Sequence, residues 1–291
     1  MIDLQGKVAV VTGSGQGLGL SVAQALAKAG AAVVVNDVDA DRAQTAVELI
    51  TAAGGRATAE VVAVGSSEAA DRCVERAVSA FGRLDIMVTN AGILRDKVLW
   101  NMSDADFDQV IETHLRGTFT CARAAVKHFR ARKEGGRLIL VSSLAGQKGN
   151  FGQGNYAAAK AGIVGFTRTW AMECARMNVT VNAVLPMALT QMVASIPGME
   201  SHVAAAQRGE SLPPEIRMGM GMGLPQEVAP LFVFLASAQA QNITGQCIGL
   251  GGDKLALWSH PEEIKVAYQQ GGWGADDIAN VWDNVFGASG A

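Results

Sequence analysis

With 291 residues, of which 49% are hydrophobic, the chain can form one large domain with a substantial core. Its net charge of -3 gives no reason to expect a nucleic-acid partner, and no apolar run is long enough to span a membrane. The cysteines are scattered, without metal-ligand spacing or a disulfide framework, so we expect no metal and a reducing, cytoplasmic location. They are Cys73, Cys121, Cys174 and Cys247.

A glycine-rich loop follows the first predicted strand. Residues 8–11 are a short apolar run, Thr12-Gly-Ser-Gly-Gln-Gly-Leu-Gly19 comes directly after it, and an amphipathic run covers residues 21–29. Glycines let the backbone approach a pyrophosphate, and a helix N-terminus presents unpaired N–H groups to it. The pattern therefore predicts a dinucleotide site, and the alternative is a tight turn without a ligand.

The second predicted strand, residues 32–35, leads to Asp37. This aspartate lies about twenty residues beyond the glycines, where a carboxylate accepts hydrogen bonds from the hydroxyls of the adenosine ribose. A 2′-phosphate would meet a like charge there, so we expect NAD rather than NADP. The alternative is that Asp37 is a helix N-cap or a turn residue.

The remaining pattern alternates between strands and helices, which predicts an α/β fold. We expect a single doubly wound Rossmann-type domain with a seven-stranded parallel sheet, whose ligands bind at the carboxyl ends of the strands. Predicted helices cover about residues 41–53, 69–81, 104–132, 156–177 and 225–237, and further strands cover about 56–64, 86–89, 138–141, 179–186 and 246–249.

Three residues carry the chemistry that we predict. Tyr156 and Lys160 stand four residues apart, so on a helix they share one face, and Ser143 follows a predicted strand. A neighbouring cation favours the phenolate, which brings the proton of a tyrosine within reach of acid–base work near neutral pH. The serine can donate a hydrogen bond to the same carbonyl oxygen.

Together these motifs resemble the short-chain dehydrogenase/reductase family over about residues 4 to 252. The family's glycine loop matches residues 12–19, its Asn-Ala-Gly motif matches residues 90–92, and its triad matches Ser143, Tyr156 and Lys160. The resemblance implies that the tyrosine exchanges the proton, the lysine also holds the nicotinamide ribose, and the serine orients the substrate oxygen. It further implies a tetramer with the helices that begin near 104 and 156 at the main interface, where Phe166 and Trp170 are either interface or core residues.

The resemblance also assigns binding residues. Substrate contacts are expected at Ser143, Gln153, Tyr156, Met187 and Met192. Cofactor contacts are expected at Gly13, Gln16, Gly17, Leu18, Gly19, Asp37, Val64, Asn90, Ala91, Gly92, Tyr156, Lys160, Pro186, Leu189 and Thr190.

The chain departs from the family pattern at three positions. Ala63 replaces an aspartate that touches adenine, which makes the backbone at Val64 the expected contact, and Met187 replaces a glycine beside the nicotinamide. His114 stands where an asparagine completes the proton relay. An imidazole can donate from one nitrogen and accept at the other, so His114 either takes part in that relay or is a core histidine.

The runs at residues 90–96, 114–117 and 149–153 resemble the (3R)-hydroxyacyl-CoA dehydrogenase units of peroxisomal multifunctional enzymes type 2 and their bacterial single-domain relatives. This implies an NAD-dependent oxidoreductase that interconverts a secondary alcohol and a ketone, most simply on a (3R)-3-hydroxyacyl-CoA. Alternatives are a 17β-hydroxysteroid dehydrogenase, a 3-oxoacyl-carrier-protein reductase and, from another class, a non-catalytic dinucleotide-binding sensor or scaffold. Asp37 argues against the reductase, and the complete triad argues against the sensor.

Two segments lie outside the regular pattern. Residues 191–224 are rich in methionine, glycine and proline, which suits a lid over a bulky, lipid-like substrate, and a loosely ordered loop is the alternative. Residues 253–291 form a C-terminal extension beyond the domain of residues 1–252. Because this extension contains Trp258, Trp273 and Trp282, we expect it to pack on the substrate cleft or on a neighbouring subunit.

Basic residues gather between positions 127 and 137. Such a cluster could dock an acidic acyl carrier or CoA, although the solvated end of a helix is the simpler interpretation. Its members are Lys127, Arg130, Arg132, Lys133 and Arg137.

Overall fold

The computed structural model describes residues 2–194 and 198–287, which form two compact units, Met1–Trp258 and Ser259–Ala291. The first unit contains the sheet and nearly all of the predicted site. Residues 195–197 of the predicted lid lie outside the described residues. That the extension packs on the cleft or on a neighbouring subunit stays a prediction.

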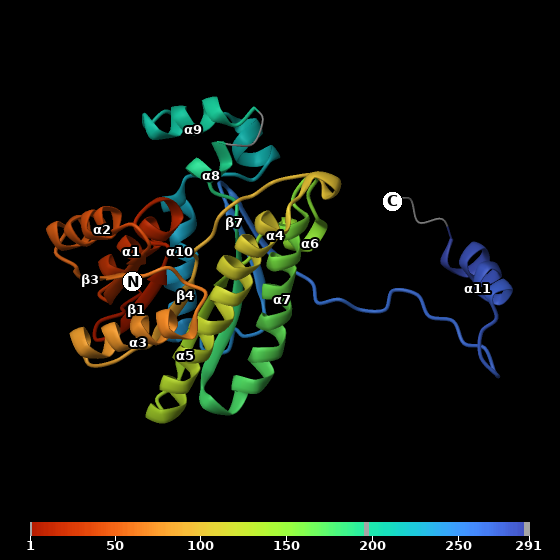
Figure 1. The fold of residues 1–291 in the computed structure, drawn as a ribbon, viewed down its shortest axis with the longest axis horizontal. Helices are drawn as coiled ribbons and strands as arrows, with labels where there is room; N and C mark the ends of the chain where they lie inside the picture. The colour runs from red at the N-terminus through yellow and green to blue at the C-terminus, as the bar shows by residue number, and fades with distance from the viewer. Residues whose placement is uncertain (1, 195–197, 288–291) are drawn as a thin grey trace. The chain divides into compact units, whose positions relative to one another are not determined.

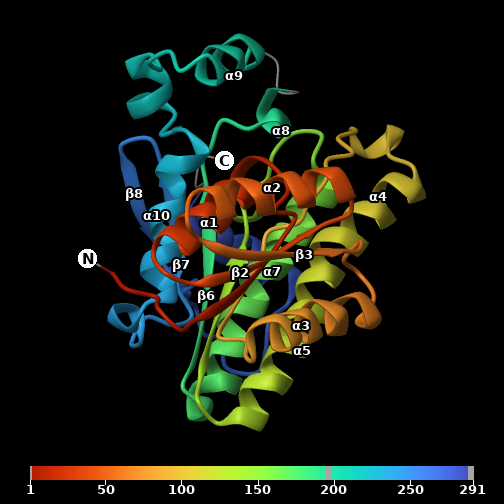
Figure 2. The same cartoon turned by 90° about the vertical axis from the view of Figure 1, so that its left-hand side faces the viewer.

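Within the described residues, eight strands form one sheet in the order β3-β2-β1-β4-β5-β6-β7-β8. Figures 1 and 2 show this sheet with helices on both faces. The strands β1, β2 and β4 are buried along their whole length, because helices cover both faces of a parallel sheet. The strands are β1 (Val8–Thr12), β2 (Ala32–Asp37), β3 (Arg56–Val61), β4 (Ile86–Thr89), β5 (Gly136–Val141), β6 (Val179–Pro186), β7 (Cys247–Gly251) and β8 (Lys254–Trp258).

The prediction of seven strands was therefore wrong by one. The seven predicted strands are present and parallel, and β8 adds an antiparallel edge strand paired with β7. Gly252, with a φ of +51°, allows the tight turn between the two strands. This segment falls within the predicted extension, since an edge strand with exposed Leu255 and Leu257 lacks the pattern of a buried parallel strand.

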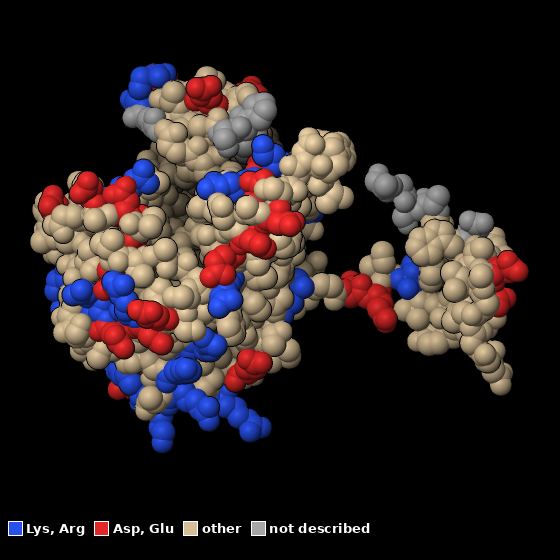
Figure 3. Space-filling model, viewed as in Figure 1, with Lys and Arg blue, Asp and Glu red and all other residues tan. Residues whose placement is uncertain are grey.

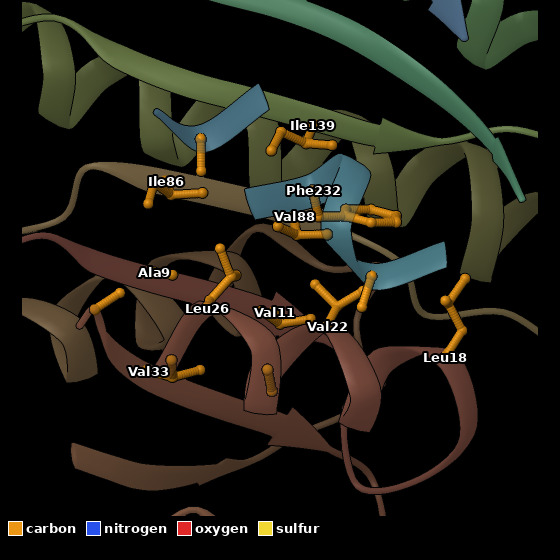
Figure 4. Packing of buried hydrophobic residues seen from close by; sticks show 14 of the residues in the cluster. Ala9, Val11, Leu18, Val22, Leu26, Val33, Ile86, Val88, Ile139 and Phe232 are labelled. Atoms are coloured by element: carbon orange, nitrogen blue, oxygen red, sulfur yellow. The ribbon is translucent and has the colours of Figure 1, made fainter. Parts of the chain in front are cut away.

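Helices cover the sheet in two layers. One apolar core lies between the sheet and α1, α2 and α10, and Figure 4 shows Leu26 and Phe232 among the side chains of this core. A second core lies between the other face and α3, α5 and α7. The helices are α1 (Gly17–Lys28), α2 (Ala40–Ala52), α3 (Ser67–Phe81), α4 (Asp104–Val110), α5 (Gly117–Arg132), α6 (Ala145–Lys148), α7 (Gly154–Cys174), α8 (Gln191–Ala194), α9 (Glu200–Gln207), α10 (Pro225–Ala236) and α11 (Ala275–Val281).

The helix predicted over residues 104–132 is interrupted. A π-helical turn, Ile111–Arg116, joins α4 to α5, and His114 lies in this turn. Such turns occur within α-helices and are frequent at functional sites. The helix predicted from 156 to 177 is α7, which begins two residues earlier at Gly154 and continues as a short 3₁₀ turn, Ala175–Met177.

The predicted lid segment contains α8, α9 and a π-helical turn, Glu215–Gly219. It has a small apolar core of its own, made by Leu189, Met199, Val203, Leu212 and Ile216. In the second unit, α11 continues into a π-helical turn that ends at Phe286, and several of its apolar side chains are exposed.

Candidate active site

The predicted site residues meet at the carboxyl ends of neighbouring strands. The glycine loop follows β1, Asn90 follows β4, Ser143 follows β5 and Pro186 ends β6, and these four strands are adjacent in the sheet. Parallel strands bring such positions to one edge, where α/β sheets bind ligands. The topology therefore brings together residues that lie far apart in the sequence.

The glycine loop fits a dinucleotide pyrophosphate. Gly13 and Gly17 have φ values of +62° and +58°, and a Cβ added to Gly13 would lie 2.7 Å from the backbone Cα of Ala91. Among the described residues, no side chain caps the start of α1, so its first N–H groups remain available for an anion. Gln16 is the N-cap residue, and Leu18 points into the core beneath the loop.

Thr12 and Asn90 fix the course of this loop. The Asn90 amide donates to the carbonyl oxygens of Thr12, at 2.9 Å, and of Gly13, at 3.1 Å. The Thr12 hydroxyl accepts from the backbone N–H groups of Asn90 and Ala91, at 2.9 and 3.0 Å. In this arrangement the side chain of Asn90 positions the loop. Thr12, which is not among the predicted contacts, is a further positioning residue.

Asp37 ends β2 beside the glycine loop and is 7% exposed. Its carboxylate accepts from the backbone N–H of Gly15, at 2.9 Å, and from that of Asp39, at 3.1 Å. The N-cap of α2 is Asp39, so Asp37 is not a helix cap, whereas its bond with the Asp39 N–H is that of an Asx turn, as the alternative of a turn residue predicts. Asn36 donates to the carbonyl oxygens of Glu60 and Val62, which ties β2 to the segment that leads to Val64.

Tyr156 and Lys160 lie on one face of α7, as predicted. The Lys160 ammonium is 5.5 Å from the centroid of the Tyr156 ring and donates to the Val141 carbonyl oxygen at 2.6 Å. Burial lowers the pKa of Lys160 to about 7. Burial raises the pKa of Tyr156, while a hydrogen bond with Ser143 opposes that rise. The three side chains thus form one connected group in which a proton can be held or released.

His114 packs against this group. Its ring is 2% exposed and lies edge-on to the Tyr156 ring, with the centroids 5.1 Å apart. The Nε2 atom lies 2.9 Å from the Ile93 nitrogen and 2.7 Å from the Ile93 oxygen, and Nδ1 has no partner among the described residues. Burial and, after it, the charge of Lys160 lower the pKa of His114 to about 3, so the ring is neutral. A neutral ring can exchange a hydrogen bond with a water molecule, as an amide does.

The loop after Gly92 is fastened to the start of α7. The Gln153 amide donates to the Asp96 carboxylate at 2.7 Å, and the buried Asn155 amide donates to the carbonyl oxygens of Arg95 and Asp106. These bonds anchor the start of α7, which carries Tyr156. Neither Asn155 nor Asp96 was predicted as a site residue. The only signal in the sequence was their place, because Asn155 precedes Tyr156 and Asp96 ends the run at residues 90–96.

The segment after β6 is hydrogen bonded to the predicted lid segment. Leu189 donates its backbone N–H to Gly223, and Thr190 accepts from Val193 at the start of α8. Met187 is 6% exposed and packs on Gly251, where an added Cβ would overlap it. Glycine at 251 therefore allows the backbone oxygens of Met187 and Gly221 to approach closely, whatever side chain stands at position 187. Met192 lies on α8 and is 37% exposed.

The basic cluster lies at the other end of the sheet. It surrounds the end of α5 and the start of β5, whereas Ser143 follows the end of that strand. Figure 3 shows Lys and Arg side chains gathered beyond this end of α5. This position favours the interpretation of a solvated helix end over that of a docking site that serves Ser143.

Within residues 2–194 and 198–287, no three His, Cys, Asp or Glu side chains are placed to hold a metal ion. None of the helices in this described part of the chain is long and apolar enough to cross a membrane.

Several proteins of known sequence are similar to this chain. The hydroxyacyl-CoA dehydrogenase ChsB1 of Mycobacterium tuberculosis is 43% identical over 89% of this chain and 81% of its own length. A 3-oxoacyl-[acyl-carrier-protein] reductase of Thermotoga maritima is 36% identical over 86% of this chain and 98% of its own length. The peroxisomal hydratase-dehydrogenase-epimerase of Neurospora crassa is 43% identical over 96% of this chain, which spans only 30% of that longer protein.

Solved structures agree with these relatives. A short chain dehydrogenase from Mycobacterium avium superposes with a TM-score of 0.83 at 37% sequence identity, over 98% of this chain and 96% of that one. The short chain dehydrogenase family matches residues 7–201, which include the glycine loop and the Ser143, Tyr156 and Lys160 group. The chain therefore belongs to the short-chain dehydrogenase/reductase family, and it is an oxidoreductase that acts on hydroxyl groups.

Proposed function

We propose that this enzyme oxidises a (3R)-3-hydroxyacyl-CoA to the 3-oxoacyl-CoA with NAD as the coenzyme. The observation that carries the choice of substrate is the similarity to a hydroxyacyl-CoA dehydrogenase over most of both chains. The methionine-rich lid segment and its apolar core suit the acyl part of such a substrate.

In this proposal each catalytic side chain has a separate role. The Ser143 hydroxyl holds the substrate oxygen, and Tyr156, as the phenolate, takes up the proton that the substrate hydroxyl releases and becomes the neutral phenol. Lys160, anchored on the Val141 carbonyl, lies close enough to favour the phenolate and to hold a ribose. His114 hydrogen bonds a relay water through Nδ1. NAD, when bound, accepts the hydride.

Asp37 supports NAD over NADP. Its carboxylate is buried beside the glycine loop, so a 2′-phosphate would meet a negative charge in a poorly solvated place. Arg42, the nearest candidate to balance that phosphate, pairs with Asp39 at 3.4 Å. A reductive role is the second candidate, because two acyl-carrier-protein reductases are 36% and 39% identical over nearly their whole lengths.

The test compares several substrates, each with both coenzymes. Formation of NADH or NADPH is followed with a (3R)-hydroxyacyl-CoA, its (3S) epimer and a 17β-hydroxysteroid, each with NAD and with NADP, and consumption of NADPH is followed with a 3-oxoacyl carrier substrate. Selective turnover of the (3R) thioester with NAD is the expected result. Faster NADPH-dependent reduction of a 3-oxoacyl carrier substrate would replace the proposal with the reductase, and steroid-only turnover would remove the acyl-CoA assignment.

We also propose a cytoplasmic homotetramer. The four cysteines are free and buried, which suits a reducing compartment. Phe166 and Trp170 stack on α7 with centroids 4.3 Å apart, and the exposed Phe119 of α5 lies 6.4 Å from Phe166. These rings form an aromatic surface across both helices, which suits the predicted interface. Light scattering of the wild type and of Phe119→Glu tests it, and a monomeric wild type would refute it.

A further inference from the structure

Gly15 occupies a position in the glycine loop where the backbone itself does not require glycine. Its φ lies outside the left-handed region, in contrast to Gly13 and Gly17, so its conformation is open to other residues. What excludes a side chain is space. A Cβ at this position would lie 2.7 Å from Oδ2 of Asp37 and 2.8 Å from the Cβ of Arg42.

The two neighbours differ in how easily they can move. The Arg42 Cβ is fixed to the backbone of α2, whereas the Asp37 carboxylate is the end of a side chain that can rotate. That carboxylate is held where it is by the N–H groups of Gly15 and Asp39. A methyl group at position 15 therefore requires the loop to move away from the Arg42 Cβ and the carboxylate to leave its place, and both shifts break the hydrogen bond between the carboxylate and the Gly15 N–H.

We propose that Gly15 is a positioning residue that sets the coenzyme preference by holding the Asp37 carboxylate toward the adenosine ribose. With the carboxylate displaced, the ribose hydroxyls lose their acceptor, and a 2′-phosphate no longer meets the charge at short range. The inference rests on the proposed use of NAD, and it goes further by naming the residue that controls the carboxylate.

The experiment compares wild type, Gly15→Ala, Asp37→Ala and the double variant. Dissociation constants for NADH and NADPH are measured from the quenching of protein fluorescence, and kcat is measured at saturating coenzyme. Hydrogen bonds to a charged group are strong enough that Gly15→Ala should shift the NADH/NADPH affinity ratio toward NADPH by about tenfold or more. The kcat at saturating coenzyme is recorded for each variant, so that a loss of turnover is not counted as a change in coenzyme preference.

Two controls separate positioning from general damage. In the Asp37→Ala background, Gly15→Ala should change the ratio less than about twofold, because its target is gone. Gly82→Ala is the matched glycine control, since Gly82 has a φ of +82° and no atom within 4 Å of an added Cβ. It should lower the melting temperature through backbone strain and leave the ratio unchanged.

The outcomes distinguish this inference from the proposed function. An NAD-preferring wild type whose ratio is unchanged by Gly15→Ala, or is changed equally in the Asp37→Ala background, would overturn the role of Gly15 alone. A wild type that binds NADPH more tightly than NADH would overturn the proposed coenzyme instead.

Discussion

Lowering the pH from 7 to 5 should weaken the fold through His114. The folded-state pKa of this ring is about 3, whereas an unperturbed histidine titrates near pH ~6.5. Between these values the unfolded chain binds more protons than the folded one, so stability falls as the pH falls from about 6.5 toward 3. At pH 5 the solution is about 1.5 pH units below the pKa of this histidine in the unfolded chain. At about 1.36 kcal/mol per unit, the free energy of unfolding therefore falls by about 2 kcal/mol.

The assay is urea unfolding followed by circular dichroism at pH 7 and pH 5, at one fixed protein concentration because an oligomer links stability to concentration. His114→Asn removes the titrating imidazole and places at this position the amide that the family pattern has there. We expect its loss of stability between the two pH values to be about 2 kcal/mol smaller than that of the wild type. His260→Asn, which replaces an exposed histidine, is the control and should follow the wild type.

Equal losses in wild type and His114→Asn would refute the reasoning, because they would mean that the buried ring does not resist protonation. A lower stability of His114→Asn at both pH values would not count as support. Losing the hydrogen bonds to Ile93 has that effect without any titration. The decisive quantity is the difference between the two pH values.

Three further predictions concern the triad and the lid. Tyr156→Phe should lower kcat by about 10²-fold or more and leave the NADH dissociation constant within about twofold, measured by fluorescence; unchanged turnover would contradict its role. Because the pKa of Lys160 falls to about 7 in the fold, the stability of the wild type relative to that of Lys160→Met should rise between pH 7 and 10 by an amount on the order of 4 kcal/mol; denaturation of both proteins at each pH measures this difference, in which the buried cysteines that titrate in both proteins cancel. Arg217 pairs with Glu227 on α10 at 2.9 Å and with Asp253 in the β7–β8 turn at 2.7 Å. Arg217→Met should therefore loosen the predicted lid segment and speed its proteolysis. It should also raise the substrate KM by about threefold or more, without changing the NADH dissociation constant.

Much of the site could be predicted because its chemistry depends on local spacing and on strand order. Tyr156 and Lys160 share a helical face through their four-residue separation, and the glycine loop is contiguous. Ser143 could be placed because parallel strands collect the residues at their carboxyl ends. These inferences need no knowledge of how distant side chains pack.

The features that escaped prediction depend on contacts between distant segments. The π-helical turn around His114 leaves the helical pattern intact, so the sequence suggests one continuous helix. Asn155 donates to carbonyl oxygens of residues 60 and 49 positions away in the sequence. The close approach of Gly15 to Asp37 joins the loop after β1 to the end of β2. A single sequence does not reveal which residues share such a contact.

The departure from the family pattern at position 114 becomes understandable through the residues that accompany it. A histidine at position 114 is larger than an asparagine, and it fits because Gly92 has no side chain where an added Cβ would overlap the imidazole. The Ile93 backbone then holds Nε2, and Nδ1 is left without a partner among the described residues. The three atoms nearest to an added Cβ at Gly92 all belong to the His114 ring, so Gly92→Ala should disturb the site less in a His114→Asn background than in the wild type.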